Sequence, residues 1–263
     1  MVENLQTLML YARDIAEQAG KKIMHVYQQD FDVISKADKS PLTEADMAAH
    51  HHITEKLSEL ADYPVLSEES AKLPFSERSS WQTYWLVDPL DGTKQFVQRT
   101  GEFCVCIALI HQNQAVLGAI HLPVSKENYF ACQGYGAYKQ SRGQAAKKIQ
   151  TRKLGNPCIA AVSRSHKGDA TSEMLDKIGE CELKVAGSAI KACWVAEGKA
   201  DIYPRLWLTS EWDTAAAQCI VEEAGGLLTT LDLQPMRYNT KDDLLNPYFL
   251  VFGDKSIDWS QYL

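Results

Sequence analysis

Residues 84–93 read Tyr84-Trp-Leu-Val-Asp88-Pro-Leu-Asp91-Gly-Thr93, a short apolar run followed at once by two carboxylates. The apolar run predicts a buried strand that ends at Asp88, where the proline fixes the backbone φ and removes an N–H group. The glycine and threonine after Asp91 predict a helix start, whose free N–H groups can hold an anion. This turn can direct two carboxylates and a backbone carbonyl towards one point. Because Mg²⁺ prefers such oxygen ligands, the motif predicts a magnesium site beside an anion site.

The segments around this motif have clear periodicities. Apolar residues between Leu5 and Tyr27 recur at helical spacing and predict an amphipathic helix. A second helix is predicted to run to about Leu60, with Thr43 as its N-cap. Further along, residues 103–110 and 115–121 predict strands joined by a turn, and residues 129–138 predict another hairpin.

A domain junction is predicted in the polar and basic segment of residues 140–157, which has few large apolar side chains. The expected domains are residues 1–150, an α+β half, and residues 151–263, an α/β half. In the second half, residues 159–162 and 200–203 predict strands, and residues 191–197 and 213–223 predict helices. Helices and strands interleave throughout, so the predicted fold class is mixed α and β.

The charge of the chain argues against a nucleic-acid polymer as partner. Its 263 residues include 34 acidic and 27 basic ones, which gives a formal net charge of −7. Non-specific binding of polynucleotides normally requires a basic surplus. A small phosphorylated substrate stays compatible with this charge, because bound metal ions would reverse its local sign.

The cysteines and the chain ends bear on location. The seven cysteines are odd in number, contain no Cys-x-x-Cys and lie mostly in apolar runs, which predicts reduced core thiols and argues against structural zinc. The N-terminus lacks the features of a signal peptide, and no stretch approaches the ~18 apolar residues of a spanning helix. We expect a cytoplasmic protein that is a monomer or weak homodimer, with peripheral attachment to the cytoplasmic face of the inner membrane left open.

Three further acidic clusters accompany the motif: Asp46 in Thr-Glu-Ala-Asp, the pair Glu68-Glu69, and Asp213 after a tryptophan. Taken singly, such residues have ordinary explanations. Glu68-Glu69 could lie in a solvated loop, and Asp213 could cap its helix. The three consecutive histidines 50–52 follow Asp46 on the predicted helix, where neighbours point to different faces. We interpret them as helix surface and not as a metal site.

Taken in order, these blocks resemble the inositol monophosphatase superfamily of lithium-sensitive, magnesium-dependent phosphatases. The pattern is Glu-Glu, then Asp-Pro-(Ile/Leu)-Asp-Gly-Thr, then Trp-Asp and, after eleven residues, Gly-Gly, here Gly225-Gly226. All three blocks are present, and the resemblance covers essentially the whole chain. It implies a layered α/β/α/β/α sandwich with the active site between the two halves.

The resemblance also implies the roles of the site residues. Glu68, Asp88 and the carbonyl of Leu90 would hold a first magnesium ion, and Asp88, Asp91 and Asp213 a second. Asp46 would activate water or hold a third, looser ion. Thr93, hydrogen-bonded through the neighbourhood of Glu68, would help to orient and deprotonate the attacking water, so the catalytic set is Asp46, Glu68 and Thr93. In such two-metal hydrolysis one ion activates the water and the other stabilises the leaving oxygen. The substrate phosphate would contact Glu68, Leu90, Asp91, Gly92, Thr93 and Asp213.

Three later segments look like the 3′(2′),5′-bisphosphate nucleotidase branch of this superfamily. Ser163 and His166 in Ser163-Arg-Ser-His166 would approach the nucleoside, while Ser188, Lys191 and Arg205 would contact the second phosphate. A second phosphate remote from the metals needs its own cations and hydroxyls. The expected substrate is adenosine 3′,5′-bisphosphate, hydrolysed to AMP and phosphate in sulfate assimilation and nucleotide recycling, with the sulfated analogue as a second substrate.

Two alternatives stay open at this point. An inositol-phosphate phosphatase would need to recognise only ring hydroxyls, and such enzymes characteristically carry an acidic residue near the position of Arg205. A non-catalytic sensor of bisphosphate nucleotides would have no need of Thr93 and a complete set of metal ligands, all of which this chain retains.

Overall fold

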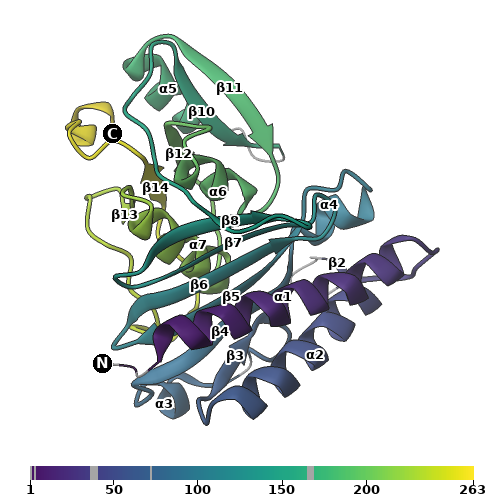
Figure 1. Cartoon of the computed structure of the whole chain (residues 1–263). Helices are drawn as coiled ribbons and strands as arrows, with labels where there is room; N and C mark the ends of the chain where they lie inside the picture. Colours follow the sequence, from purple (N-terminus) through teal and green to yellow (C-terminus); the bar gives the residue numbers. More distant parts are fainter. Residues whose placement is uncertain (1, 3, 36–40, 72, 165–168) are drawn as a thin grey trace.

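The computed structural model describes residues 2, 4–35, 41–71, 73–164 and 169–263. Its strands form two large sheets with helices between and outside them (Figure 1). In spatial order, the seven-stranded sheet contains β3 (Val65–Ser67), β4 (Thr83–Asp91), β5 (Cys104–His111), β6 (Gln114–Leu122), β7 (Glu127–Cys132), β8 (Gly136–Ser141) and β9 (Lys147–Lys148). The five-stranded sheet contains β11 (Cys181–Ala186), β10 (Cys158–Ser163), β12 (Ile202–Arg205), β14 (Phe249–Phe252) and β13 (Leu227–Thr230). A small antiparallel ribbon of β1 (Val33–Ser35) and β2 (Pro41–Thr43) stands apart from both.

The helices complete a layered arrangement. Helices α1 (Leu5–Tyr27) and α2 (Glu44–Leu60) cover one face of the seven-stranded sheet (Figure 1). Helices α6 (Ile190–Ala196) and α7 (Glu211–Glu223) lie between the two sheets, and α5 (Asp169–Ile178) packs against the far face of the five-stranded sheet. The predicted mixed class and the α/β/α/β/α sandwich are therefore confirmed. The short helices are α3 (Phe75–Arg78), α4 (Thr93–Val97), η1 (Glu68–Ser70) and η2 (Trp259–Tyr262).

Close packing fixes the position of α7 on the seven-stranded sheet. Its middle carries three alanines, 215–217, whose small side chains let the helix backbone approach the sheet. Opposite them, β6 carries Gly118, and a Cβ at this position would collide with the backbone carbonyl of Ala216. Since buried backbone has little freedom to shift, this contact sets where the first turn of α7 lies.

Most predicted elements are confirmed, with shifts at some ends. Helix α1 has the predicted bounds, and α2 ends at Leu60 with Thr43 as its N-cap. Helix α7 begins at Glu211, two residues before the predicted start, because Ser210 is its N-cap. The predicted strand at 200–203 lies at Ile202–Arg205 instead.

Other expectations concern the chain as a whole. All seven cysteines are free, and six of them are buried, as predicted. Within the described residues, no helix combines the length and the apolar character needed to span a membrane. The division into halves at residue 150 stays a prediction.

Candidate active site

The end of β4 brings the first two carboxylates into place. Strand β4 pairs with β5 up to Asp88 and again at Asp91, and the ladder is interrupted between them, where Pro89 has no N–H to donate. Within this interruption the Leu90 N–H donates to Asp88 Oδ1 at 3.0 Å. Gly92 then adopts φ 98°, and α4 begins at the next residue. The positive φ lets the chain turn from strand to helix within one residue.

The first turn of α7 supplies the third carboxylate. Asp213 is the third residue of the helix, and the Ser210 N–H donates to its Oδ2 at 2.7 Å. Carboxylate oxygens of Asp88, Asp91 and Asp213 lie within 4.8 Å of one another. The structure therefore brings together three of the predicted metal ligands, from segments more than a hundred residues apart.

Asp46 is held at the start of α2 in the same manner. The N–H and the hydroxyl of Thr43 both donate to Asp46 Oδ2, each at 2.7 Å. The other oxygen, Oδ1, lies 3.1 Å from Thr93 Oγ1, whose second neighbour is the Leu90 carbonyl oxygen at 3.2 Å. The structure shows Thr93 bonded to Asp46, and the expected connection through the neighbourhood of Glu68 stays a prediction. Both helices thus begin with Ser/Thr-Glu-x-Asp, in which the N-cap residue fixes one oxygen of the aspartate.

Burial and mutual repulsion raise the pKa values of the clustered carboxyls. Burial is the main cause for Asp88, and the negative charges of Glu68, Asp91 and Asp213 add to it. Burial also raises the pKa of Asp213 to about 7, with Asp91 as the next contribution. The charge of Glu68 contributes to the raised pKa of both Asp88 and Asp213, so Glu68 lies near both carboxylates.

This donor set fits a magnesium ion. Ionised carboxylates held this close in a buried site repel one another, and a divalent cation removes that repulsion. Hard oxygen ligands from separate segments are what Mg²⁺ takes in proteins. In contrast, the histidines 50–52 lie on a partly exposed stretch of α2, as predicted, and His50 Nδ1 lies 2.9 Å from Ser67 Oγ.

A cavity of about 310 Å³ opens beside the carboxylates. Its walls come from both halves of the chain, and they include most of the predicted substrate contacts: Asp91, Gly92, Thr93, Ser163, Ser188, Lys191, Arg205 and Asp213. Asp46 and Asp88 are almost fully buried, at 1% and 2% exposure. His166 lies outside the described residues.

Lys191 is hydrogen-bonded within its own loop as well as lining the cavity. Its ammonium donates to the carbonyl oxygens of Ser188 (2.6 Å) and Ala186 (3.3 Å), and the residue is only 2% exposed. The same loop presents the Ala189 N–H to Asp91 Oδ2 at 2.6 Å. Burial lowers the pKa of Lys191 to about 8, although the charge of Asp91 opposes this effect. Lys191 therefore supports the loop that holds Asp91, besides lining the cavity.

Arg205 also lines the cavity, and its contact with a phosphate stays a prediction. It is partly exposed, its Nη1 donates to Ser163 Oγ at 3.0 Å, and its Nη2 lies 3.4 Å from the Leu208 carbonyl oxygen. Both partners are neutral, and within the part of the chain that the structure describes no carboxylate forms an ion pair with Arg205. A guanidinium so placed at the wall of a cavity is well suited to bind a phosphate group.

Sequence reasoning missed Glu102, which joins the two halves beside the cavity. Its Oε2 accepts from the Gly187 N–H at 2.9 Å, and its carboxylate pairs with Arg164 through two hydrogen bonds of 2.8 and 2.5 Å. The hydrogen bond from Arg164 lowers the pKa of Glu102. No local motif marks Glu102, because both partners are distant in sequence.

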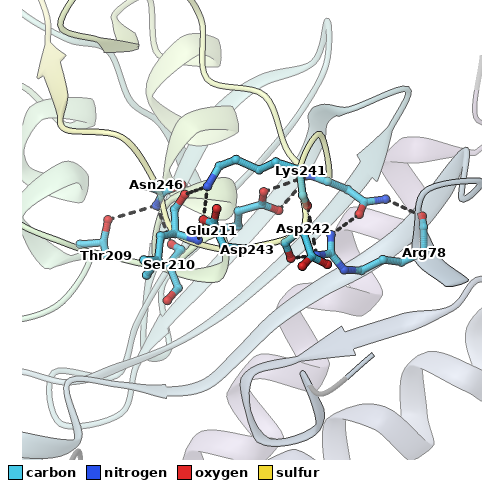
Figure 2. Close-up of polar contacts among 10 residues, drawn as sticks. Arg78, Thr209, Ser210, Glu211, Lys241, Asp242, Asp243 and Asn246 are labelled. Atoms are coloured by element: carbon cyan, nitrogen blue, oxygen red, sulfur yellow. Dashed lines mark hydrogen bonds and ion pairs between the residues drawn. The ribbon is translucent and has the colours of Figure 1, made fainter. Parts of the chain in front are cut away.

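Sequence reasoning also missed a polar network that holds the start of α7 (Figure 2). The side-chain amide of Asn246 donates to the Ser210 carbonyl oxygen at 2.6 Å, as Figure 2 shows. Its nitrogen also lies 3.1 and 3.0 Å from the hydroxyl oxygens of Thr209 and Thr214, which can share its second hydrogen. Its backbone N–H donates to the Thr209 carbonyl oxygen at 2.8 Å. Asn246 thus fixes the residues that precede and cap the Asp213 turn.

The far end of this network reaches α3 (Figure 2). The carboxylate of Glu211 accepts from the Asn239 N–H at 2.9 and 3.1 Å. The buried Arg78 donates through Nη1 to Asn239 Oδ1 at 2.5 Å, and the Asn239 side-chain amide donates to the Arg78 backbone carbonyl oxygen at 2.6 Å. Arg78 also donates to the carbonyl oxygens of Lys241 and Asp242. The segment 239–246 therefore connects α3 to the start of α7.

We expect Asn246→Ala to weaken magnesium binding as well as stability. Loss of the amide leaves buried hydrogen-bonding groups unsatisfied, which should cost about 1–3 kcal/mol of unfolding free energy. Because the Asp213 turn is then less well held, magnesium affinity should fall about tenfold. Denaturant unfolding and calorimetric titration with magnesium measure the two effects. Asn239→Ala, at the far end of the network, is the control and should lower stability alone. Equal losses of magnesium affinity in both variants would contradict a positioning role for Asn246.

The chain is similar to known proteins over most of its length. The profile of the Inositol monophosphatase family matches residues 4–252. The 3′(2′),5′-bisphosphate nucleotidase CysQ of Aggregatibacter actinomycetemcomitans is 39% identical over 251 residues, which is 94% of this chain and 93% of the relative. CysQ of Salmonella typhimurium is 45% identical over 240 residues, or 90% and 96% of the two chains. The crystal structure of CysQ from Bacteroides thetaiotaomicron superimposes with a TM-score of 0.83 at 41% identity, covering 95% of this chain and 98% of that one.

Proposed function

The chain belongs to the inositol monophosphatase family, and on this premise we propose that it is a phosphatase that removes the 3′-phosphate of adenosine 3′,5′-bisphosphate. The observation that carries the proposal is the cavity, whose lining combines two carboxylates of the cluster, Asp91 and Asp213, with the hydrogen-bonded pair Arg205 and Ser163. A bisphosphate needs both features, one for the ester that is cleaved and one for the phosphate that stays. The relatives named as bisphosphate nucleotidases at 39–45% identity support the same substrate class.

We propose magnesium as the cofactor, with two or three ions per site. Glu68, Asp88 and the Leu90 carbonyl would hold one ion, and Asp88, Asp91 and Asp213 another. When bound, the ions supply positive charge that makes water a better nucleophile and stabilises the leaving oxygen. The buried carboxylates with raised pKa values support this assignment, because each gains from a nearby cation.

The chain's own residues would prepare the attacking water. Thr93 Oγ1 lies at the cavity wall and 3.1 Å from Asp46 Oδ1. It can accept a hydrogen bond from water while it donates its own proton towards Asp46, so a proton leaving the water has a path into the buried carboxylate. The two bonds from Thr43 keep Asp46 in the orientation that this path requires.

Other groups would hold the phosphate that is cleaved. The first turn of α7 carries the partial positive charge of a helix N-terminus, which favours an anion beside Asp213. The backbone amides of Gly92 and Thr93 lie at the same wall of the cavity and are proposed to donate to phosphate oxygens. Sulfated analogues of the substrate would fit the same arrangement, with the sulfate on the phosphate that stays.

Phosphate release from four compounds tests the proposal. We expect turnover of adenosine 3′,5′-bisphosphate and its sulfated analogue with a kcat/KM at least about tenfold above that for inositol 1-phosphate or fructose 1,6-bisphosphate. Faster turnover of inositol 1-phosphate would favour the alternative, an inositol-phosphate phosphatase. Binding of the bisphosphate without turnover of any compound, with magnesium present, would leave only a sensor.

We expect Arg205→Ala to separate recognition of the second phosphate from catalysis. A charge-assisted contact of this kind is worth about 1.5–3 kcal/mol, or roughly 10- to 100-fold in kcat/KM for adenosine 3′,5′-bisphosphate. Adenosine 3′-monophosphate lacks the 5′-phosphate, so its hydrolysis should hardly change. Lys191→Ala should slow both substrates, because Lys191 also supports the loop that binds Asp91. Equal losses on the two substrates in Arg205→Ala would remove Arg205 from the second phosphate site.

Lithium inhibition is the next expected property, and it follows from family membership. A monovalent ion in the place of one magnesium ion supplies too little charge to stabilise the leaving oxygen. We expect uncompetitive or mixed inhibition at roughly millimolar to tens of millimolar lithium, where weak cation sites fill. The measurement is the initial rate against lithium at fixed magnesium, with potassium chloride at matched ionic strength as the control. Rates that do not respond would place the chain outside the lithium-sensitive branch.

A further inference from the structure

Two cysteines lie directly beneath the carboxylate cluster. Cys104 and Cys106 are two residues apart on β5 and therefore point to the same face of the sheet. In the register of the antiparallel pair, Cys104 is opposite Asp91 and Cys106 is opposite Asp88. The two Sγ atoms lie 3.8 Å apart, and Cys104 Sγ lies 3.5 Å from Asp91 Oδ2. Nothing in the proposed function uses either thiol.

These distances match the spacing of ligands around a thiophilic cation. Zinc binds thiolate sulfur at about 2.3 Å and carboxylate oxygen at about 2.1 Å in tetrahedral sites. Tetrahedral angles then require about 3.8 Å between two sulfurs and about 3.6 Å between sulfur and oxygen. The three ligand atoms of Asp91, Cys104 and Cys106 all lie within 4.8 Å of one another. In the absence of a metal, hydrogen bonds between these groups hold the atoms at this spacing.

We propose that Asp91, Cys104 and Cys106 form a binding site for a thiophilic divalent cation, Zn²⁺ or Cd²⁺, whose occupation inhibits the phosphatase. Sulfur ligands are soft and select these ions against Mg²⁺, which requires oxygen. On binding, the two thiols release their protons to solvent and the carboxylate of Asp91 completes the ligand set. Asp91 is then withdrawn from the magnesium site.

An ion can reach this site through the cavity. Cys104 and Cys106 are buried, at 0% and 1% exposure, but Asp91 lines the cavity and is partly exposed. Asp91 therefore belongs to both sites. Its carboxylate would meet the entering cation first, and the thiols lie directly behind it.

The chain offers a matched control in a second pair of thiols. Cys158 and Cys181 are paired in register on the neighbouring strands β10 and β11. Hydrogen bonding between them is one of the causes that raise the pKa of Cys158. Neither residue lines the cavity, and neither contacts a carboxylate of the cluster. A cation bound there should leave phosphatase activity unchanged.

Titration with CdCl₂ tests the site on the whole protein, reduced with a phosphine and free of magnesium. The readout is the ultraviolet absorption of cadmium–thiolate bonds, so the result does not depend on activity. We expect Cys104→Ser/Cys106→Ser to lose at least about tenfold in cadmium affinity at this site, while Cys158→Ser/Cys181→Ser retains it. Asp91→Asn should retain the absorption but require about tenfold more cadmium. The same titration with ZnCl₂, followed by competition with cadmium, extends the result to zinc.

Inhibition is measured separately, and this part rests on the proposed function. Micromolar cadmium should abolish phosphate release by the wild type and by Cys158→Ser/Cys181→Ser, and a chelator added together with excess magnesium should restore it. If Cys104→Ser/Cys106→Ser does not fold, the single variant Cys106→Ser should show about half of the thiolate absorption. Equal absorption and affinity in wild type and the Cys104/Cys106 variants would overturn the site. A wild type that releases no phosphate from nucleotides would overturn the proposed function and leave the cadmium result standing.

Discussion

Asp213→Asn should lower the rate of phosphate release by about a thousandfold or more and, at the same time, raise the melting temperature of the metal-free protein. The loss of rate follows because a charged ligand is removed from a divalent cation that is worth several kcal/mol to the reaction. The gain in stability follows because desolvation and the charges of Asp91 and Glu68 raise the pKa of Asp213, so that its ionised form is unfavourable in the metal-free site. The amide oxygen of asparagine can still accept the hydrogen bond from the Ser210 N–H.

A second buried aspartate provides the control for the expected loss of rate and gain in melting temperature. Asp201 is buried, at 1% exposure, and Arg152 binds it through two hydrogen bonds of 2.6 and 2.7 Å. It also accepts from the Ile159 N–H at 2.6 Å. Asp201→Asn should therefore lower the melting temperature, since it leaves the guanidinium without its partner. The measurements are kcat with magnesium and thermal unfolding with a chelator. Normal turnover by Asp213→Asn, or a fall in its metal-free melting temperature, would contradict the assignment of Asp213 as a metal ligand.

The stability of the metal-free protein should fall as the pH rises towards neutrality. The pKa of Asp213 is about 7 in the folded state against 3.8 for an ordinary aspartate. Below pH 3.8, Asp213 is protonated in both the folded and the unfolded state and does not lower the free energy of unfolding. Between 3.8 and about 7 the folded protein holds more protons than the unfolded chain, so the free energy of unfolding declines with pH. The cost is on the order of a few kcal/mol and is complete above the folded pKa.

Magnesium should remove this dependence, because a bound cation favours the ionised carboxylates and adds its own binding free energy to the folded state. Burial lowers the pKa of His50, His52 and His121, and their contributions have the opposite sign, since they are lost as the pH falls. The difference between wild type and Asp213→Asn cancels the histidines. Unfolding of both proteins at several pH values from about 4 to about 8, with and without magnesium, measures it. A difference that does not vary with pH in the metal-free proteins would show that Asp213 keeps an ordinary pKa.

The fold and the acidic cluster could be predicted to a large extent, because the sequence signals for them lie within short segments of the chain. Helix α1 has regular apolar spacing, and β4 runs directly into the aspartate motif. Each element can therefore be recognised from its own residues alone. The start of α7 was placed two residues late, because the Ser210 side of its cap looks like an ordinary polar loop in the sequence. The capping signal was present, since Ser210 and Asp213 stand three residues apart.

The supports of the site could not be predicted, because their partners are far apart in the chain. Asn246 acts on Thr209 and Ser210, and Glu102 acts on Arg164 and Gly187, and none of these pairs forms a motif. The hydrogen bonds of Lys191 within its own loop could not be predicted either. Its charge suggested a ligand contact, which stays a prediction, and the sequence did not indicate that its ammonium also donates to two backbone carbonyls of its own loop. Whether a lysine faces a ligand or its own backbone depends on the turn that precedes it.

The paired helix starts at Thr43 and Ser210 bear on how this chain can vary during evolution. In each, the aspartate is fixed relative to the N-cap residue three positions earlier, and not relative to the loop that leads into the helix. Insertions and deletions before the N-cap can therefore change loop length while the carboxylate keeps its place. A single residue added between the N-cap and the aspartate would instead rotate the acid by about 100° around the helix axis. Lineages of this protein should accordingly differ in length before positions 43 and 210, and hardly at all within the three residues that follow each.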